Sequence, residues 1–375
     1  MHDPRYARQI VLKEWGTAGQ EQLKASRVLL VGLGGLGSPA ALYLAAAGVG
    51  TLGLIDPDQV DLSNLQRQVL YDTADAGAMK VERAAARLQA LNPELQLELY
   101  PERFCAANAL SICSRYDLII DGSDNFACKF LVNDVCVKLR KPLVYGSILR
   151  WEGQLAVFWA PHGPCYRCLF PEPPKAYVPN CAEAGVIGAL AGTLGSLQAL
   201  EAMKVLVSGM PPYTSELRPL LGRLWLLRSQ TMESQTLRIP KNPDCTVCSK
   251  PPEEIPLRDE KGFEGCALGL TEVKADDLLP EQAWTQYLCI DVREQVEWDA
   301  GHIPGAIHRP LSLLPHSKPG DWPSDERPWL LYCQGGVRSR RAYDILKSQG
   351  HTIHGHIQEG FRAWRGPIER ASPRA

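Results

Sequence analysis

The chain has 375 residues, and its 40 basic residues nearly balance its 42 acidic ones, for a net charge of −2. This length predicts two or three domains and is enough to bury a full hydrophobic core. The near-neutral charge creates no global field that would attract nucleic acid or an anionic membrane, so we expect neither as a partner. The amino-terminal sequence MHDPRYARQ is polar and charged, unlike a signal peptide, which predicts a cytoplasmic protein.

Short apolar runs alternate with helical stretches along the first part of the chain. Four such runs predict strands, at residues 27–32, 51–56, 116–125 and 141–148. A helix is expected over 38–48, with Ser38 as its cap and Pro39 in its first turn. Because the strands are apolar throughout and alternate with helices, we expect an α/β fold with a Rossmann-like, doubly wound sheet covered on both faces.

Residues 28–55 carry no charge, and their length alone would allow them to span a bilayer. Seven glycines and Pro39 interrupt this stretch, with the glycines clustered at 32–37 and 48–53. Such interruptions are typical of a soluble strand–turn–helix–turn–strand unit. We therefore expect no membrane span here.

The sequence GLGGLG at 32–37 fits the pattern G-x-G-x-x-G between a strand and a helix. Glycines at these positions let phosphate approach backbone N–H groups at a helix amino terminus. Asp56 closes the second strand, 19 residues after Gly37, where a carboxylate can hold ribose hydroxyls. This pattern alone is typical of an NAD-dependent oxidoreductase, and glycines that only pack a helix on a strand remain an alternative.

Further polar residues beyond the strand ends favour a triphosphate. Asn64 and Arg67 follow the second strand, Lys80 comes soon after them, and Asp124 follows the third. A dinucleotide does not require two cations and another carboxylate. A triphosphate does, because cations neutralise its charge and a carboxylate can hold Mg²⁺. We therefore expect ATP with Mg²⁺.

Four of the twelve cysteines form two C-x-x-C pairs, Cys165 with Cys168 and Cys245 with Cys248. The spacing suits tetrahedral Zn²⁺ held by four thiolates, which is typical of a closed, structural site. A redox C-x-x-C is the alternative, but no thioredoxin-like context accompanies either pair. A shared metal would tie two distant segments of one domain together.

The composition changes after the second cysteine pair. Residues 249–268 are charged and rich in proline, which predicts a linker, and a second α/β pattern begins near 269. Within it, LLYCQGGVRSRRA places Cys333 between an apolar run and a helical one. The N–H groups of a short glycine-containing turn form an anion nest, and a helix starts behind it. Both favour a thiolate or persulfide anion at Cys333.

Two parts of the chain resemble known families. The motifs RYARQI, GLGGLGSPAALYLAAAGVG, DLSNLQRQ, DGSDN, CYRCLFPEPP and NCAEAGV resemble the MoeB/ThiF family, adenylyltransferases related to ubiquitin-activating enzymes. DVREQVEWDAGHIPGAIH, the cysteine loop and GFRAW together resemble a rhodanese domain. The resemblance implies an adenylation domain at 1–248, a linker at 249–268 and a rhodanese sulfurtransferase domain at 269–375.

The MoeB/ThiF resemblance implies a reaction in which a small ubiquitin-like sulfur-carrier protein ending in Gly-Gly attacks the α-phosphate of MgATP through its terminal carboxylate. The products are an acyl-adenylate and pyrophosphate. It also implies roles for matching residues: Gly35 in the phosphate turn, Asp56 on ribose, Asn64, Arg67 and Lys80 on phosphates, and Asp124 on Mg²⁺. Arg8 resembles an arginine that reaches the ATP of the other subunit, which implies a homodimer. The four paired cysteines resemble the family's Zn²⁺ ligands.

Cys181 lies in PNCAEAGVIG, an exposed loop by its composition. Relatives carry a cysteine here that can bond to the carrier or receive sulfur in some members and is dispensable in others. An inert, buried cysteine is the alternative interpretation. Both remain open at the level of sequence.

The rhodanese resemblance implies that the loop from Cys333 to Arg338 carries a persulfide. A loop one residue longer would suit phosphate, as in dual-specificity phosphatases, so the six-residue span favours sulfur. Gln334 stands where relatives often have a cation. The combined expectation is that the Cys333 persulfide attacks the adenylated carrier, directly or through Cys181, to give a carrier thiocarboxylate. A persulfide donor such as a cysteine desulfurase would supply the sulfur.

Three alternatives stay open. The rhodanese part could only dock a partner or sense redox state, the glycine loop could serve a nicotinamide-dependent oxidoreductase, or Cys181 could pass a ubiquitin-like modifier to proteins as a thioester. Thiocarboxylates serve several pathways, from molybdopterin and thiamin to tRNA thiolation and sulfur-containing secondary metabolites. Nothing in the chain selects among these pathways, the carriers or the sulfur donors.

Overall fold

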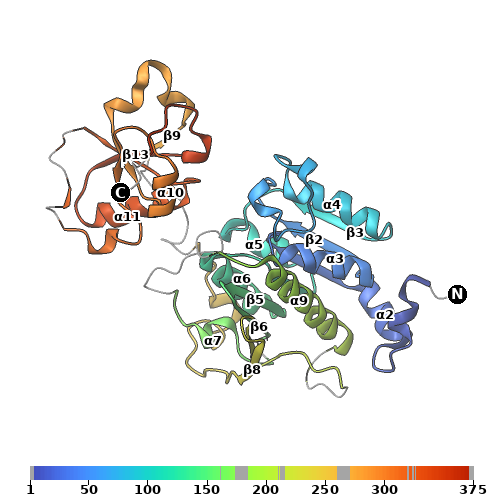
Figure 1. The fold of residues 1–375 in the computed structure, drawn as a ribbon. Helices are drawn as coiled ribbons and strands as arrows, with labels where there is room; N and C mark the ends of the chain where they lie inside the picture. Colours follow the sequence, from blue (N-terminus) through green and yellow to red (C-terminus); the bar gives the residue numbers. More distant parts are fainter. Residues whose placement is uncertain are drawn as a thin grey trace. The chain divides into compact units, whose positions relative to one another are not determined.

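The chain folds into two compact units, Met1–Glu260 and Lys261–Ala375 (Figure 1). The structure is a computed structural model that describes residues 4–160, 162–173, 185–209, 211, 216–259, 271–318, 321–322, 325 and 327–370. Within these ranges, no helix has both the length and the apolar character needed to cross a membrane. The uncharged stretch 28–55 forms a strand, a helix and a second strand, as expected.

The first unit is built on an eight-stranded sheet. Its strands are β1 (Arg27–Val31), β2 (Thr51–Ile55), β3 (Gln96–Tyr100), β4 (Leu118–Asp121), β5 (Leu143–Leu149), β6 (Glu152–Phe158), β7 (Arg223–Arg228) and β8 (Glu233–Arg238). The order is β3-β2-β1-β4-β5-β6-β7-β8. The first five strands in this order are parallel, and β6, β7 and β8 extend the sheet antiparallel. All four predicted strands are present.

Helices cover both faces of this sheet. They are α1 (Ala7–Ile10), α2 (Gly16–Ala25), α3 (Gly37–Ala47), α4 (Lys80–Leu91), α5 (Ala106–Cys113), α6 (Phe126–Leu139), α7 (Tyr166–Leu169) and α9 (Gly188–Ser208). Val28 and Leu30 of β1 pack into a core with α3, α4 and α9, whereas Leu29 and Val31 pack into a second core with α5 and α6. Alternate residues of one strand therefore enter opposite cores, which confirms the doubly wound fold.

The turn before α3 is tighter than the sequence suggested. Gly32 has φ +90°, and a Cβ on Gly37 would lie 2.0 Å from the Gly32 carbonyl oxygen. The helix consequently begins at Gly37, one residue early, without a side-chain cap. Ser38 instead donates its hydroxyl to the Leu33 carbonyl at 3.1 Å inside the turn, so the prediction that Ser38 caps the helix is wrong. Pro39 does lie in the first turn of the helix.

The second unit has a smaller, fully parallel sheet. Its strands are β9 (Thr271–Val273), β10 (Leu288–Asp291), β11 (Ile307–His308), β12 (Trp329–Tyr332) and β13 (Ile353–Ile357), in the order β11-β10-β12-β13-β9. The helices are α10 (Gln295–Ala300) and α11 (Val337–Ser348). Adjacent residues Leu330 and Leu331 of β12 enter two different cores. This confirms the expectation of a second, smaller α/β unit.

The stretch predicted as a linker, 249–268, is described as far as Asp259, and that part packs on the first unit. Lys138 donates to the carbonyls of Pro252 at 2.7 Å and Ile255 at 3.0 Å, and the Ile255 side chain is buried among the paired cysteines. Asp259 accepts a hydrogen bond from the Ala106 amide. The domain boundaries proposed from the sequence therefore remain predictions, since the rest of this stretch lies outside the described residues.

Candidate active sites

The glycine loop lies against the ends of two neighbouring strands. A Cβ on Gly32 would lie 3.0 Å from the backbone of Gly122, which directly follows β4. The loop also meets the end of β2, where the Asp56 carboxylate accepts hydrogen bonds from the amides of Leu33 at 2.7 Å and Asp58 at 2.9 Å. Parallel pairing of β1 with both β2 and β4 thus brings three loops to one edge of the sheet.

Asp56 and Lys80 are both buried at this edge. Lys80 Nζ lies 2.9 Å from an oxygen of Asp58 and 3.9 Å from one of Asp56. Burial raises the pKa of Asp56, and the nearby Lys80 ammonium partly offsets that effect. The two predicted ligand contacts therefore belong to one charged cluster next to the glycine loop.

Arg67 reaches the middle of the glycine loop. A Cβ on Gly35 would lie 3.4 Å from the Arg67 side chain, so glycine leaves room for the arginine stem. Arg67 donates to the Ser63 carbonyl at 3.1 Å, and its amide donates to the Asn64 carbonyl. Asn64 ends a short 3₁₀ turn, Leu62–Asn64, and thereby shapes the approach of Arg67 to the loop.

One buried side chain beside the glycine loop favours a ligand that donates a hydrogen bond. Gln68, which sequence reasoning missed, is buried, and its Oε1 has no hydrogen-bond partner among the described residues. Its Nε2 would lie 3.7 Å from a Cβ on Gly34, so the side chain borders the glycine loop. A buried polar atom without a partner is costly. Because this amide oxygen can only accept, it favours a ligand group that donates a hydrogen bond, such as a ribose hydroxyl, rather than a phosphate oxygen. Gln68 belongs to the motif DLSNLQRQ, and that motif was the signal that could have identified it.

Asp124 is exposed and follows a turn that a buried lysine holds in place. Lys129 Nζ donates to Asp121 Oδ2 at 2.8 Å and to the carbonyls of Ser123 and Gly146 at 2.9 Å. The Asp121 carboxylate also accepts from the amide and hydroxyl of Ser123. Sequence reasoning missed Lys129, although a lysine in the apolar helical run FACKFLV is a signal for a buried ion pair.

Arg8 does not join this site within one chain. It is exposed on α1, and the next residue, Gln9, donates to the carbonyl of Ala47 at 3.0 Å. Ala47 ends α3, whereas the glycine loop precedes it, so the length of the helix, about 15 Å, separates them. A role for Arg8 in the site of another subunit remains a proposal.

The paired cysteines come together in the first unit. Their Sγ atoms all lie within 4.8 Å of one another, with Cys165 3.6 Å from Cys245 and Cys168 3.5 Å from Cys248. Four thiolates around Zn²⁺ at about 2.3 Å have sulfur–sulfur edges of about 3.8 Å. The arrangement can therefore hold a metal ion.

Cys333 directly follows β12 and begins a tight loop. The Gly336 amide donates to Cys333 Sγ at 3.1 Å, and Gly336 has φ +86°. The following segment of chain backs the loop, because the Phe361 amide donates to the Cys333 carbonyl at 2.7 Å and the Arg362 amide to the Gln334 carbonyl at 3.1 Å. The helix α11 begins directly after the loop, as expected.

Arg338 makes two hydrogen bonds to Glu297 of α10, at 2.6 and 2.7 Å. Burial alone would raise the pKa of Glu297, but the Arg338 bonds outweigh it and the net pKa is lowered. The ion pair ties the start of α11 to α10. A catalytic role for Arg338 stays a prediction.

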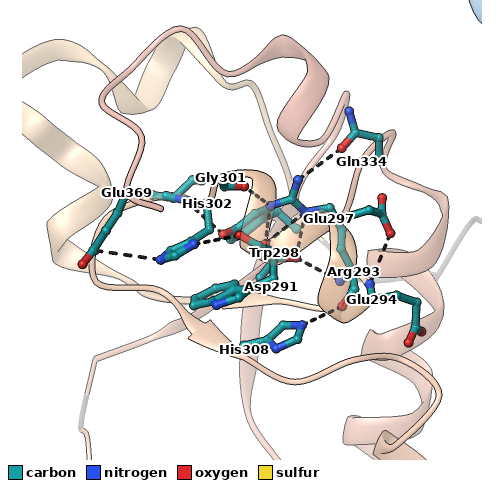
Figure 2. A network of polar contacts seen from close by, with 12 residues as sticks. Asp291, Arg293, Glu294, Glu297, Trp298, Gly301, His302, His308, Gln334 and Glu369 are labelled. Atoms are coloured by element: carbon teal, nitrogen blue, oxygen red, sulfur yellow. Dashed lines mark hydrogen bonds and ion pairs between the residues drawn. The ribbon is translucent and has the colours of Figure 1, made fainter. Parts of the chain in front are cut away.

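Gln334 is backed by a buried arginine that sequence reasoning missed. Figure 2 shows Arg293 between Asp291 and Gln334: it lies 2.6 Å from the Asp291 carboxylate and donates to Gln334 Oε1 at 3.2 Å. Its guanidinium also lies 4.0 Å from the centre of the Phe361 ring. Arg293 belongs to the motif DVREQ, and a charge directly after an apolar strand was the signal. Gln334 is itself uncharged, and Arg293 places a cation next to it.

Three further cysteines can be located or not. Cys289 is a buried core residue of β10. Cys181 lies outside the described residues, so its predicted role in transfer stays untested. Cys266 also lies outside them.

Comparison with known proteins identifies both units. Residues 6–247 match the ThiF family, and residues 274–366 match the rhodanese-like domain. The chain belongs to the ThiF family and carries a rhodanese-like domain. It is 41% identical over 373 residues to the probable adenylyltransferase/sulfurtransferase MoeZ of Mycobacterium tuberculosis, covering 96% of this chain and 92% of that protein.

Further similarities agree with this assignment. The adenylyltransferase and sulfurtransferase MOCS3 of Sus scrofa is 39% identical over 406 residues, covering 98% of this chain and 87% of that protein. Two crystal structures of E. coli MccB share the fold, each at 21% sequence identity. The complex of MccB with MccA-N7isoASN has a TM-score of 0.59, covering 67% of this chain and 75% of that one. The complex of MccB with ATP has a TM-score of 0.57, covering 66% of this chain and 75% of that one. This ThiF-family chain is an adenylyltransferase and sulfurtransferase.

Proposed function

We propose that the chain adenylates the carboxyl terminus of a small ubiquitin-like sulfur carrier ending in Gly-Gly and then converts it to a thiocarboxylate. The observation that carries this proposal is that one chain holds both a glycine loop bordered by cations and a cysteine whose sulfur accepts a loop amide. The first arrangement suits a triphosphate and the second suits a sulfur anion.

In the adenylation step, the carrier carboxylate attacks the α-phosphate of ATP and pyrophosphate leaves. Two anions repel each other, so the site must neutralise phosphate charge and hold the carboxylate in line. Arg67 would supply positive charge beside Gly35 and Lys80 beside Asp56, while Asp56 would hold the ribose and Asn64 a phosphate. Asp124 would hold Mg²⁺, which neutralises the leaving pyrophosphate. Arg8 of a second copy would complete the site of a homodimer.

In the sulfur-transfer step, the terminal sulfur of a Cys333 persulfide attacks the acyl-adenylate carbonyl and AMP leaves. The product is an acyl disulfide between carrier and Cys333. A second thiol, from Cys181 or a dithiol reductant, attacks the Cys333 sulfur of this bond and releases the carrier thiocarboxylate. Cys333 is left in a disulfide that a further thiol reduces. A cysteine desulfurase would renew the persulfide.

Zn²⁺ would be held by the four paired cysteines, where it supplies a structural cross-link and no reaction step. Its thiolates join the segment around Cys165, which follows β6, to the segment around Cys245, which follows β8. The cluster packs with Ile255 and Val137. Loss of the metal would therefore loosen the end of the first unit.

The test is intact-mass analysis of a Gly-Gly-ended sulfur carrier incubated with the chain, MgATP, and cysteine with a cysteine desulfurase, read beside pyrophosphate release. Replacement of one carboxyl oxygen by sulfur is expected, and Cys333→Ala should abolish it while pyrophosphate release persists. Asp124→Asn should abolish both. Pyrophosphate release without sulfur gain from any donor would leave a rhodanese unit that only docks a partner. Absence of pyrophosphate with every carrier would refute the adenylation step.

A further inference from the structure

A buried chain of hydrogen bonds runs behind the cysteine loop. Ser339, on the first turn of α11, and His356, on β13, are both completely buried. Ser339 Oγ lies 3.0 Å from His356 Nδ1, and Arg340 Nε lies 3.2 Å from His356 Nε2. On the loop side, the same hydroxyl lies 2.9 Å from the Gly336 carbonyl oxygen and 3.7 Å from Cys333 Sγ.

The donor and acceptor properties of these groups assign every proton in this series of hydrogen bonds. An arginine can only donate, so His356 Nε2 must accept. A neutral histidine then carries its proton on Nδ1 and donates it to Ser339. The serine has one proton, which points to the Gly336 carbonyl, and two lone pairs. One lone pair takes the histidine N–H, and the other faces Cys333 Sγ.

The surroundings keep His356 neutral. Burial and the Arg340 guanidinium lower its pKa to about 4, against a smaller opposing effect of Glu272. Glu272, on the edge strand β9, accepts a hydrogen bond from Arg340 and lies 3.9 Å from His356 Nε2. The series of hydrogen bonds therefore extends from the exposed Glu272 carboxylate to Cys333 Sγ. Arg340 sets its direction, because it can only donate to His356.

We propose that His356 and Ser339 are positioning residues for sulfur transfer, because they hold the Ser339 hydroxyl where it can serve Cys333 in both protonation states. It accepts the S–H of the thiol at rest. When the thiol ionises, the hydroxyl proton turns from the Gly336 carbonyl to the sulfur, where the Gly336 amide already donates at 3.1 Å. This inference rests on the proposed role of Cys333 as the persulfide carrier.

Backbone geometry supports a precise fit at this place. A Cβ on Gly336 would lie 2.0 Å from the carbonyl oxygen of Gln358, two residues beyond His356. The loop and the end of β13 therefore touch without an intervening side chain. If the loss of His356 shifted β13, the loop that contains Cys333 would therefore be displaced as well.

The test uses the full chain carrying His356→Leu, His356→Asn or Ser339→Ala, with His354→Asn as a control on the same strand, where the side chain is exposed. Two quantities are measured. One is kcat and KM for sulfur transfer from thiosulfate to cyanide. The other is the pH profile of Cys333 alkylation by iodoacetamide, followed at the Cys333 peptide by mass spectrometry.

Losing a hydrogen bond to a charged group changes the pKa of that group by about one unit or more. His356→Leu and Ser339→Ala should therefore each lower kcat about ten-fold and raise the pH midpoint of alkylation by about one unit. The KM for thiosulfate should stay within about two-fold of its original value, since neither side chain contacts substrate. His356→Asn keeps a donor close to the position of Nδ1 and should restore most of both quantities. The control should match the unsubstituted chain.

Unchanged kcat and alkylation profile in Ser339→Ala would overturn the proposal, even if His356→Leu fails to fold. Failure of His356→Asn to improve on His356→Leu would also contradict it, since a purely steric effect of losing the imidazole ring would weaken both variants alike. The charged groups around the loop, namely Arg293 with Asp291, Arg338 with Glu297, and Arg362, are the same in all variants. If Cys333→Ala retains sulfur transfer, the proposed function fails, and the alkylation profile still decides the positioning role.

Discussion

Lys129→Met should destabilise the first unit by about 3–5 kcal/mol, because it leaves the Asp121 carboxylate buried without its counter-charge. The two side chains of this ion pair are only 5% and 1% exposed, and the nitrogen–oxygen distance is 2.8 Å. The carbonyls of Ser123 and Gly146 lose a donor as well. A loss of this size is a large part of the roughly 5–15 kcal/mol that stabilises a typical domain.

The protonation state of Lys129 determines how the destabilisation depends on pH. Burial by itself lowers the pKa of Lys129, but Asp121 outweighs it, and the net pKa lies above the ordinary 10.5. A raised lysine pKa contributes stability that is fully present below about pH 10 and disappears only as the pH rises through the raised value. The destabilisation by Lys129→Met should therefore be constant between about pH 6 and 9.

The assay is hydrogen exchange at increasing denaturant, read on peptides from β4 and β5, so that the first unit is followed separately from the second. The matched control is Lys24→Met. Its ion pair with Glu94 has the same 2.8 Å distance, but both side chains are more than half exposed. Lys24→Met should lower the free energy of unfolding by less than about 1 kcal/mol.

A double variant separates charge from packing. Lys129→Met combined with Asp121→Asn leaves no uncompensated charge, and the amide oxygen of the introduced asparagine can still accept hydrogen bonds from Ser123. The double variant should recover at least about 2 kcal/mol. The reasoning is refuted if Lys129→Met costs no more than the exposed control, or if the double variant is no more stable than the single one.

Three further outcomes are expected. The Glu297 carboxyl has a lowered pKa, so its contribution to stability is present above about pH 4.5 and lost as the pH falls through the lowered value, and Glu297→Gln should remove that acid dependence in thermal melts of the second unit. Gly336→Ala should abolish persulfide formation, measured by mass spectrometry, and lower the melting temperature. The control Gly305→Ala, at φ +73° in open space, should lower the free energy of unfolding by only about 1–2 kcal/mol, less than Gly336→Ala does. Cys248→Ser should lower the zinc content, measured by elemental analysis, from about one ion per chain and lower the melting temperature of the first unit.

Much of the fold could be predicted because its signals are local. The apolar strands, the glycine turn between β1 and α3, and the cysteine before α11 each follow from residues close together in the chain. The prediction that failed, the Ser38 cap, depended on how closely Gly37 approaches Gly32. That approach is a three-dimensional distance which spacing does not encode.

The candidate sites divide in the same way. Arg67, Lys80, Asp124 and Cys333 could be named from motifs, since each occupies a turn, a helix start or the position just after a strand within a recognisable pattern. The residues that hold them were missed. Lys129 supports the turn before Asp124 through contacts with residues on two strands, and its own neighbours in α6 are apolar.

The sequence by itself determined the two α/β units, the glycine loop, the paired cysteines and the cysteine loop, because each is written in short-range patterns. Only the tertiary structure decided that Arg293 backs Gln334 and that His356 reaches Ser339. The members of each pair are 41 and 17 residues apart. They meet because β12 pairs in parallel with β10 on one side and β13 on the other. A buried polar group must find a partner wherever the fold brings one, and that choice is made by packing across the sheet rather than by neighbours in the chain.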